Sequence, residues 1–146
     1  MARLSRRQVL AASGAIAAAP LAKAFEAPNV ILPQASRAVV IASGNGNSMK
    51  NGGDEVCVQR AFRLITEGSD VLDALIAGVN IVELDPADTS VGFGGLPNAD
   101  GVVQLDSCCM HGPKKWAGGV ASLEGVRTPS LVAKAVAEQT DHHLLV

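Results

Sequence analysis

The sequence is poor in aromatic and charged residues. It has no Tyr, one Trp and three Phe among 146 residues, and only 18% of its residues are charged. This composition excludes a nucleic-acid binder that works through stacked aromatic side chains and basic patches. Hydrophobic residues make up 48% of the chain and its mean hydropathy is +0.26, so the chain is not intrinsically disordered. The length allows one domain.

Cysteine is scarce as well. The three cysteines, Cys57, Cys108 and Cys109, are an odd number and form no CxxC spacing, which excludes a disulfide framework and a structural zinc site. Because neighbours in a strand point to opposite faces, one of Cys108 and Cys109 is expected in the core and the other outside. The group Cys108-Cys109-x-His111 lacks the four convergent ligands of a zinc site. No metal and no cofactor is therefore predicted.

The N-terminal segment has the pattern of an export signal. Residues 1–24 contain four basic and no acidic residues, an Ala-rich apolar run over 9–21, and Ala22-Lys23-Ala24 as a small-x-small cleavage site. The start resembles a twin-arginine box, with Val9 where Phe is usual. An uncleaved membrane anchor is the alternative, but the Ala-rich run is only weakly hydrophobic. We therefore predict a twin-arginine-like signal peptide over 1–24, a bacterial periplasmic or secreted location, and no membrane association after its removal.

The rest of the chain is acidic. Removing residues 1–24 takes away four of the 12 basic residues and none of the 14 acidic ones, which leaves a net charge of −6. Phosphate-backbone binding depends on clustered Lys and Arg, so no nucleic-acid partner is expected. Residues 25–37 are rich in Pro and Asn without a period and are interpreted as a linker.

The first half of the remaining chain predicts a strand and two helices. The apolar run over 37–43 predicts a buried strand, and 44–47 a flexible-backbone loop. A helix is expected over 54–67, ended by Gly68 at positive φ. A second helix is expected over 70–84, with Ser69 or Asp70 as its cap. The two helices should lie antiparallel on one face of a sheet.

The second half predicts further strands and one helix. The pattern favours a hairpin with strands over 90–97 and 101–107, joined by a turn at 98–101. A pairing strand over 118–123 and a helix over 129–138 follow, and another strand begins within 142–146. These elements predict an α+β domain over 38–146.

Local chemistry alone does not identify a catalytic centre. The chain contains no GxSxG elbow and no phosphate-binding loop with its lysine. Asp85 and Asp88 are expected to be loop caps and solvated charges. His142 and His143, beside Asp141, are expected at a helix end facing solvent.

Four motifs in order carry a family resemblance. They are Asp85-Pro86-x-x-x-Ser90-Val91-Gly92-Phe93-Gly94-Gly95-x-Pro97-Asn98-x-Asp100-Gly101, Leu105-Asp106-Ser107-Cys108-x-Met110-His111-Gly112, Ala117-Gly118-Gly119-Val120-Ala121 and Thr140-Asp141-His142-x-Leu144-Leu145-Val146. Together they resemble the N-terminal part of glycosylasparaginase. The wider group is the type-2 asparaginase and isoaspartyl peptidase branch of the N-terminal nucleophile hydrolases. The resemblance covers about residues 38–146.

The resemblance implies a fold and a reaction. The fold would be an αββα sandwich, of which this chain would supply only a first-subunit portion. The precursor of such an enzyme cuts itself before a threonine, whose freed α-amine acts as base for its own hydroxyl. The substrate would be a small amide: glycosylasparagine, asparagine or an isoaspartyl peptide. The partners would be the second, C-terminal subunit of the same precursor and a further copy, giving a dimer of two-subunit units.

The nucleophilic threonine itself is not expected in this chain. None of Thr66, Thr89, Thr128 and Thr140 stands in the family's context. The chain is therefore expected to be a fragment without hydrolase activity of its own and without a catalytic residue. The alternative is a non-catalytic binding or interaction protein on a truncated hydrolase scaffold.

Two residues are predicted to support the site. Ser90 matches a family serine that lies beside the cleavage point and supports the catalytic threonine, although it is equally a serine that closes a turn. At Gly44 or Asn45 several family members carry a pocket tryptophan, so the sugar-linked substrate is in doubt. Asn45 is either a hydrogen-bonding group for a small polar ligand or a turn residue at positive φ. Some relatives hold sodium through loop carbonyls matching 83–94, but no metal is assigned here.

Overall fold

The structure is a computed structural model that describes residues 37–146. The predicted signal peptide over 1–24 and the predicted linker, except its last residue, lie outside the described residues. The elements follow in the order α2 (Gly44–Ser48), α3 (Cys57–Thr66), α4 (Val71–Glu83), the 3₁₀ turn η2 (Gly92–Gly94), β1 (Leu105–His111), β2 (Trp116–Leu123), α5 (Pro129–Gln139) and β3 (Leu144–Leu145). The α+β prediction is confirmed. No helix within 37–146 is long and apolar enough to cross a membrane.

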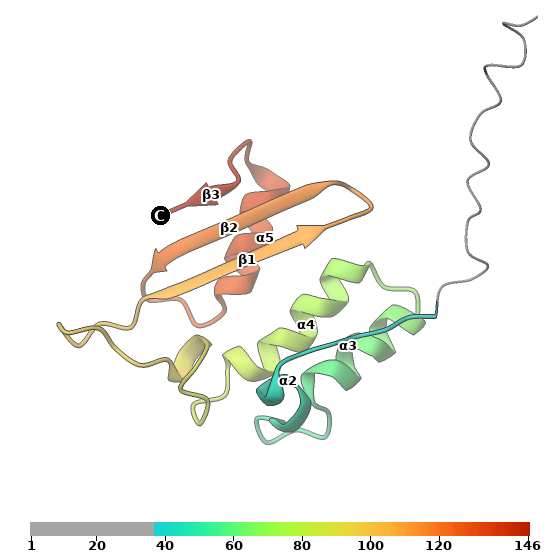
Figure 1. The fold of residues 1–146 in the computed structure, drawn as a ribbon, viewed down its shortest axis with the longest axis horizontal. Coiled ribbons are helices and arrows are strands. Elements are labelled where there is room, and N and C mark those ends of the chain that lie inside the picture. Colours follow the sequence, from blue (N-terminus) through green and yellow to red (C-terminus); the bar gives the residue numbers. More distant parts are fainter. Residues whose placement is uncertain (1–36) are drawn as a thin grey trace, which may run out of the picture. The chain divides into compact units, whose positions relative to one another are not determined.

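The strands form a three-stranded sheet in the order β1-β2-β3. β1 pairs antiparallel with β2 and is joined to it by a turn with Lys115 at φ 56°, while β3 pairs parallel with β2. The strands predicted over 118–123 and within 142–146 are thus confirmed. β1 is an outer strand of this sheet, so one of its edges has no neighbour among the described residues (Figure 1).

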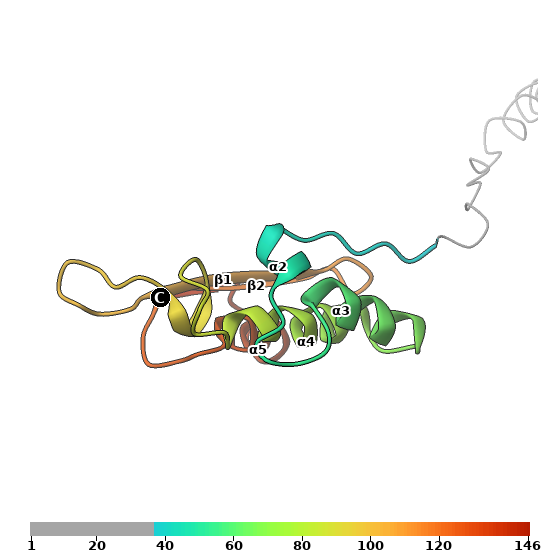
Figure 2. The same cartoon turned by 90° about the horizontal axis from the view of Figure 1, so that it is seen from below.

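The helices α3 and α4 form as their sequence pattern predicts. Gly68 ends the first helical segment at φ 94°, a conformation that costs glycine little. Asp70 caps α4, because its carboxylate accepts a hydrogen bond from the Leu72 N–H at 2.9 Å. Both helices and α5 lie on one side of the sheet (Figure 2).

Helix α5 packs closely on the sheet. It begins with Pro129 in its first turn, as predicted. Val120 of β2 forms a buried cluster with Ala133 and Val136 of α5, and Cys109 packs against it while Cys108 is exposed. The expected division between the two cysteines is confirmed, with Cys109 only partly buried.

Two predicted strands are wrong. Residues 37–43 are extended but pair with no strand in the described part of the chain, and Val39 and Ile41 are 73% and 88% exposed. A strand needs a hydrogen-bonded neighbour, which apolar patterning cannot supply. Residues 90–97 form η2 and coil instead of a strand, because Gly92 adopts φ 64° and packs on the Glu83 carbonyl, where an added Cβ would lie 2.2 Å from the oxygen.

Two smaller predictions also need correction. The segment after residue 43 is the short helix α2 and not a flexible loop, since the Ser48 hydroxyl and the Met49 N–H bond to carbonyls one turn earlier. The turn at 98–101 is present, with Gly101 at φ 80°. It joins no hairpin, because β1 begins only at Leu105.

Candidate functional site

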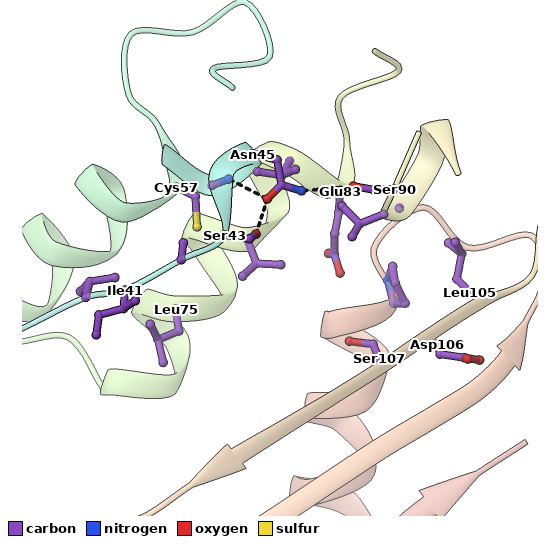
Figure 3. A pocket seen from close by; sticks show the side chains of 18 of the residues that line it. Ile41, Ser43, Asn45, Cys57, Leu75, Glu83, Ser90, Leu105, Asp106 and Ser107 are labelled. Atoms are coloured by element: carbon purple, nitrogen blue, oxygen red, sulfur yellow. Dashed lines mark hydrogen bonds between the residues drawn. The ribbon is translucent and has the colours of Figure 1, made fainter. Parts of the chain in front are cut away.

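The two predicted site residues lie together. Asn45 is the second residue of α2, and Ser90 follows the loop after α4. The Asn45 Nδ2 donates to Ser90 Oγ at 3.3 Å (Figure 3). It also donates to Asp88 Oδ2 at 2.8 Å. The structure thus brings together two residues that are 45 positions apart in the sequence.

Asn45 uses its whole side-chain amide within the protein. Its Oδ1 accepts from the Gly46 N–H at 2.8 Å and from the Ser43 hydroxyl, while its two N–H groups bind Asp88 and Ser90. A side-chain amide has two hydrogens to donate and two acceptor lone pairs, so this amide is saturated. Asn45 is in a helix and not at positive φ, and its role here is to fix the positions of its neighbours.

Asp88 is the centre of this network. Its side chain is 4% exposed, and Oδ1 accepts from both the Ser90 N–H at 2.7 Å and the Ser90 hydroxyl at 2.5 Å. The hydrogen bond from the Ser90 side chain, helped by the Ser90 and Val91 N–H groups and by Asn45, lowers the pKa of Asp88 below its usual value. The carboxylate is therefore ionised at neutral pH.

The prediction that Asp85 and Asp88 are solvated is wrong, although both do cap the loop. Asp85 accepts from the Ala87 N–H at 2.9 Å, and the two residues are only 8% and 4% exposed. The glycines of η2 fold the loop back on itself. An added Cβ at Gly94 would lie 2.3 Å from the Asp88 carbonyl oxygen. Because the loop folds back so closely, the side chains of Asp85 and Asp88 are shielded from solvent.

The hydrogen bonds determine what Ser90 can offer a ligand. Its single hydroxyl proton is given to Asp88, so its free lone pair can only accept. Ser43 gives its proton to Asn45 and is left in the same state. Both hydroxyls border the cavity described next, and both therefore suit a ligand that carries N–H groups, such as an amine or amide.

A cavity of about 590 Å³ adjoins these residues. Residues 40–43 and residues 104–107 line two sides of it, and Figure 3 shows Ile41 and Asp106 on these two sides. Leu75, Val79 and Val82 of α4 also line it and form its apolar floor. The lining includes two carboxylates, Glu83 and Asp106, and no Lys, Arg or His. The cavity lining therefore combines two acidic residues with an apolar floor.

Glu83 was missed by sequence reasoning. It is 3% exposed and accepts from the Ser130 N–H at 3.1 Å, the Ser130 hydroxyl at 2.7 Å and Asn80 Nδ2 at 2.8 Å. It thereby satisfies a free N–H in the first turn of α5. The signal was present, since Glu83 lies four residues after Val79 and seven after Ile76, on the apolar face of α4.

The structure places none of the threonines and neither of the C-terminal histidines at the cavity. Thr66, Thr89, Thr128 and Thr140 do not line it, and His142 and His143 are exposed as predicted. Cys57 does line it, but burial raises the pKa of its thiol, which disfavours the nucleophilic thiolate. Among residues 37–146 no group of three His, Cys, Asp or Glu side chains is placed to hold a metal ion.

The asparaginase family model matches residues 33–146. The chain belongs to the asparaginase family. This is a family of amide hydrolases, as the names of the relatives below show, and the match agrees with the motifs around Ser90. The supporting roles of Ser90 and Asn45 in an asparaginase site stay a prediction.

Three relatives illustrate the match. N(4)-(β-N-acetylglucosaminyl)-L-asparaginase of Elizabethkingia miricola is 44% identical over 86 residues, which is 59% of this chain and 25% of the relative. Isoaspartyl peptidase/L-asparaginase of Rattus norvegicus is 30% identical over 117 residues, covering 75% of this chain and 35% of the relative. Plant-type L-asparaginase of Pyrococcus furiosus is 34% identical over 116 residues, covering 75% and 37%. This member of the asparaginase family spans between a quarter and a little over a third of these relatives.

Proposed function

We propose that this chain is the N-terminal part of an exported bacterial amidohydrolase that cleaves the side-chain amide of asparagine derivatives. Its substrate class is glycosylasparagine, asparagine or isoaspartyl peptides, the compounds named in its relatives. The nucleophile is a threonine freed by autoproteolysis and supplied by polypeptide beyond these residues. The signal pattern over 1–24 supports export through the twin-arginine route.

The main support for this proposal is the hydrogen bonding of the Ser90 hydroxyl. Its Oγ borders a 590 Å³ cavity and has committed its proton to Asp88, so it presents an acceptor for an N–H group. The α-amine of an N-terminal threonine is such a group. With a reference pKa of about 7.7–8.0 it can also accept a proton near neutrality. Ser90 is therefore suited to orient this amine, and Asp88 and Asn45 to hold Ser90.

The reaction then proceeds without a histidine. The threonine hydroxyl oxygen attacks the side-chain carbonyl carbon of the substrate, and its proton passes to the α-amine. The tetrahedral intermediate expels ammonia, the glycosylamine or, from an isoaspartyl peptide, the amine of the following residue, and the departing nitrogen takes up that proton. Water then hydrolyses the threonine ester and releases aspartate. In this sequence the role of this chain's residues is to hold the amine and to shape the cavity.

The fold is compatible with this role. The described residues form one helical layer and one sheet layer, as expected for half of an αββα sandwich. The remaining layers would come from polypeptide outside these residues, including the second subunit, and two such units would pair as the family resemblance implies. The alternative, a non-catalytic binding protein, is not favoured, because the relatives carry enzyme names.

Complementation tests the proposal. The full 146-residue chain is mixed with the part of the Elizabethkingia miricola relative that this chain does not match, produced separately. Aspartate release is then measured from asparagine, glycosylasparagine and β-aspartyl dipeptide. We expect turnover of at least one substrate by the mixture and none by either component. Turnover by the chain alone, at a rate comparable with the mixture, would contradict the proposal.

A matched pair of variants tests the role of Ser90 in the same mixture. Ser90→Ala removes the acceptor that orients the threonine α-amine. It should lower kcat about 100-fold, which is the size of effect expected when a general base is no longer correctly positioned. Ser48→Ala is the control, because Ser48 lies in α2 but does not line the cavity. It should leave kcat unchanged. Equal effects of the two substitutions on kcat would show that Ser90 does not support the catalytic site.

A further inference from the structure

A second, smaller cavity adjoins the candidate site. It has a volume of about 220 Å³, and Gly92 and Leu105 line both this side cavity and the larger one. The chain also runs directly from one to the other, because Ser90 lines the larger cavity and Phe93, three residues later, lines the side cavity. The side cavity is therefore a direct neighbour of the place where Ser90 presents its acceptor.

The side cavity carries a positive charge. Among residues 37–146, Arg127 is the only Lys, Arg or His that lines either cavity. Its guanidinium carbon lies 4.3 Å from the centre of the Phe93 ring, so cation–π attraction holds the side chain at this position. Arg127 forms no ion pair with another residue of this part of the chain. Because the N–H groups of a guanidinium form a planar fork that matches a carboxylate, the side cavity is suited to an acidic group.

Buried contacts determine where Arg127 lies. It belongs to the connection between β2 and α5, which turns at Gly125 with φ 71°. Two residues after Arg127, Pro129 is buried and lines the larger cavity. The Ser130 N–H and hydroxyl are bound by the Glu83 carboxylate at the end of α4. The start of α5 is thereby anchored at the candidate site, and Arg127 directly precedes this anchored segment.

The other side chains of the side cavity are apolar. Val103 and Val126 line it and are partly buried, and Leu105 and Phe93 complete the apolar surface. The aspartyl part of a substrate has no apolar side chain for such a surface. A neutral sugar does not use the charge, and Arg127 covers one face of the Phe93 ring, on which a sugar could stack. The lining suits a group that carries a carboxylate and an apolar side chain together.

We propose that the side cavity binds the residue that leaves from an isoaspartyl dipeptide, and that Arg127 selects this residue. The departing residue is joined through its amine to the aspartyl side chain and ends in a free carboxylate, which Arg127 binds through two parallel N–H···O contacts. Its side chain packs on Val103 and Val126. Asparagine has no such residue, and glycosylasparagine carries a sugar in its place. This inference rests on the proposed function and narrows its substrate class to isoaspartyl dipeptides with an apolar second residue.

Binding to the full chain tests the side cavity without catalysis. N-acetyl-leucine is the probe, because it has the amide, the carboxylate and the apolar side chain of the departing residue. N-acetyl-leucine amide is the uncharged control. We expect N-acetyl-leucine to shift the NMR signals of the amides of 92–93 and 125–127 and of the Arg127 Nε–H in a saturable way, and the amide to bind at least ~10-fold more weakly. Equal binding of the two compounds, or no shift at these residues, would overturn the inference.

Substitution of Arg127 tests the selection in the complementation mixture. Arg127→Gln should raise KM for β-aspartyl-leucine at least ~10-fold and leave KM for β-aspartyl-leucine amide and for asparagine unchanged. Arg127→Lys keeps the charge without the planar fork and should have an intermediate effect. The control is Arg60→Gln, because Arg60 lines neither cavity, and it should change none of these constants. An equal rise in KM for the free acid and the amide would show that Arg127 does not bind the carboxylate.

The two experiments separate this inference from the proposed function. Saturable binding of N-acetyl-leucine at the side cavity, in a mixture that releases no aspartate from any substrate, would support the side cavity and contradict the hydrolase proposal. Hydrolysis of asparagine by the mixture, with KM for β-aspartyl-leucine unchanged in Arg127→Gln, would support the hydrolase proposal and overturn selection by Arg127.

Discussion

The α5 side of the sheet and the cavity side differ in what holds them together. At α5, Val120, Ala133 and Val136 form a dry apolar cluster, and Gly118 lets the helix backbone approach the sheet. At the cavity, a saturated network of Asn45, Asp88 and Ser90 takes the place of apolar packing. The α5 side therefore contributes stability through apolar packing. The cavity side instead holds polar atoms in fixed positions.

The two sides are linked by Glu83. This residue ends α4 and lines the cavity, yet its carboxylate holds the first turn of α5 through Ser130. A buried carboxylate with three hydrogen-bond donors is costly to disturb. We therefore expect substitutions to lower stability most at Glu83 and where α5 packs on the sheet. Substitutions on the face of the sheet that α5 does not cover should lower it least.

The largest effect is expected at Gly118. In Gly118→Ala the new Cβ would lie 2.3 Å from the Ala133 carbonyl oxygen and 2.6 Å from the Ala137 nitrogen. Because both atoms are helix backbone, α5 must move, at a cost of about 3 kcal/mol. Urea unfolding measures this loss. In the control Gly119→Ala the nearest atom is Leu144 Cδ1 at 3.3 Å, a flexible side chain, and equal losses would show that α5 is not held against β2.

The next effect is expected at Glu83. Glu83→Ala leaves the N–H and hydroxyl of Ser130 and the amide of Asn80 without their acceptor, and the free energy of unfolding should fall by about 2 kcal/mol. Glu83→Gln keeps one oxygen and should cost less. The ranking is read from urea unfolding of the two variants. A smaller loss for Ala than for Gln would mean that Glu83 does not connect the two sides.

A pH dependence is expected from Asp70. His111 Nε2 donates to this carboxylate at 2.9 Å while His111 Nδ1 accepts from the Lys114 N–H. The His111 hydrogen bond, followed by those from Lys114 and Leu72, holds the pKa of Asp70 well below its usual range. Since the folded-state pKa is depressed, the stabilisation is present above the unfolded pKa of about 3.9 and is lost as pH falls below it.

Acid titration of two variants tests this dependence. Asp70→Asn should lose stability relative to the parent chain at pH 6, and the difference should shrink as pH falls from about 4 toward 2. The control is Asp100→Asn, since Asp100 is exposed and makes no ion pair within 37–146. Thermal melts at each pH provide the measurement. A difference for Asp70→Asn that stays constant down to pH 2 would contradict the ion-pair account.

The smallest effect distinguishes the two faces of the sheet. Cys109 packs against the α5 cluster and Cys108 is exposed. Cys109→Ser should cost about 1 kcal/mol, because it places a hydroxyl beside apolar side chains, and Cys108→Ser should be neutral. Thermal unfolding of the two variants checks the order. The reverse order would mean that the uncovered face is packed by something other than α5.

Short-range sequence patterns predicted most of the helices and their ends, but little of the candidate site. Helix α4 and its Asp70 cap, the Gly68 stop and Pro129 at the start of α5 follow from short-range physics, and the structure confirms them. The wrong strand over 37–43 shows the limit, because a ladder depends on a distant partner that apolar patterning does not identify. The burial of Asp88 could not be predicted either, since it depends on how η2 folds back on the loop.

The family resemblance contributed what periodicity could not. It singled out Ser90 and Asn45, which lie 45 residues apart, and no spacing rule joins residues across that separation. It did not identify Asp88 as the centre of their network. That assignment required the hydrogen-bond geometry, which shows where the Ser90 proton goes.

The coding DNA beyond the codon for Val146 tests the central claim most directly. In the proposed function, the nucleophile of the asparaginase-type site lies in polypeptide that continues this chain. It predicts an open reading frame that carries an Asp-Thr-x-Gly segment downstream in the same frame. A stop codon directly after Val146, with no such segment encoded elsewhere in the same operon, would contradict it.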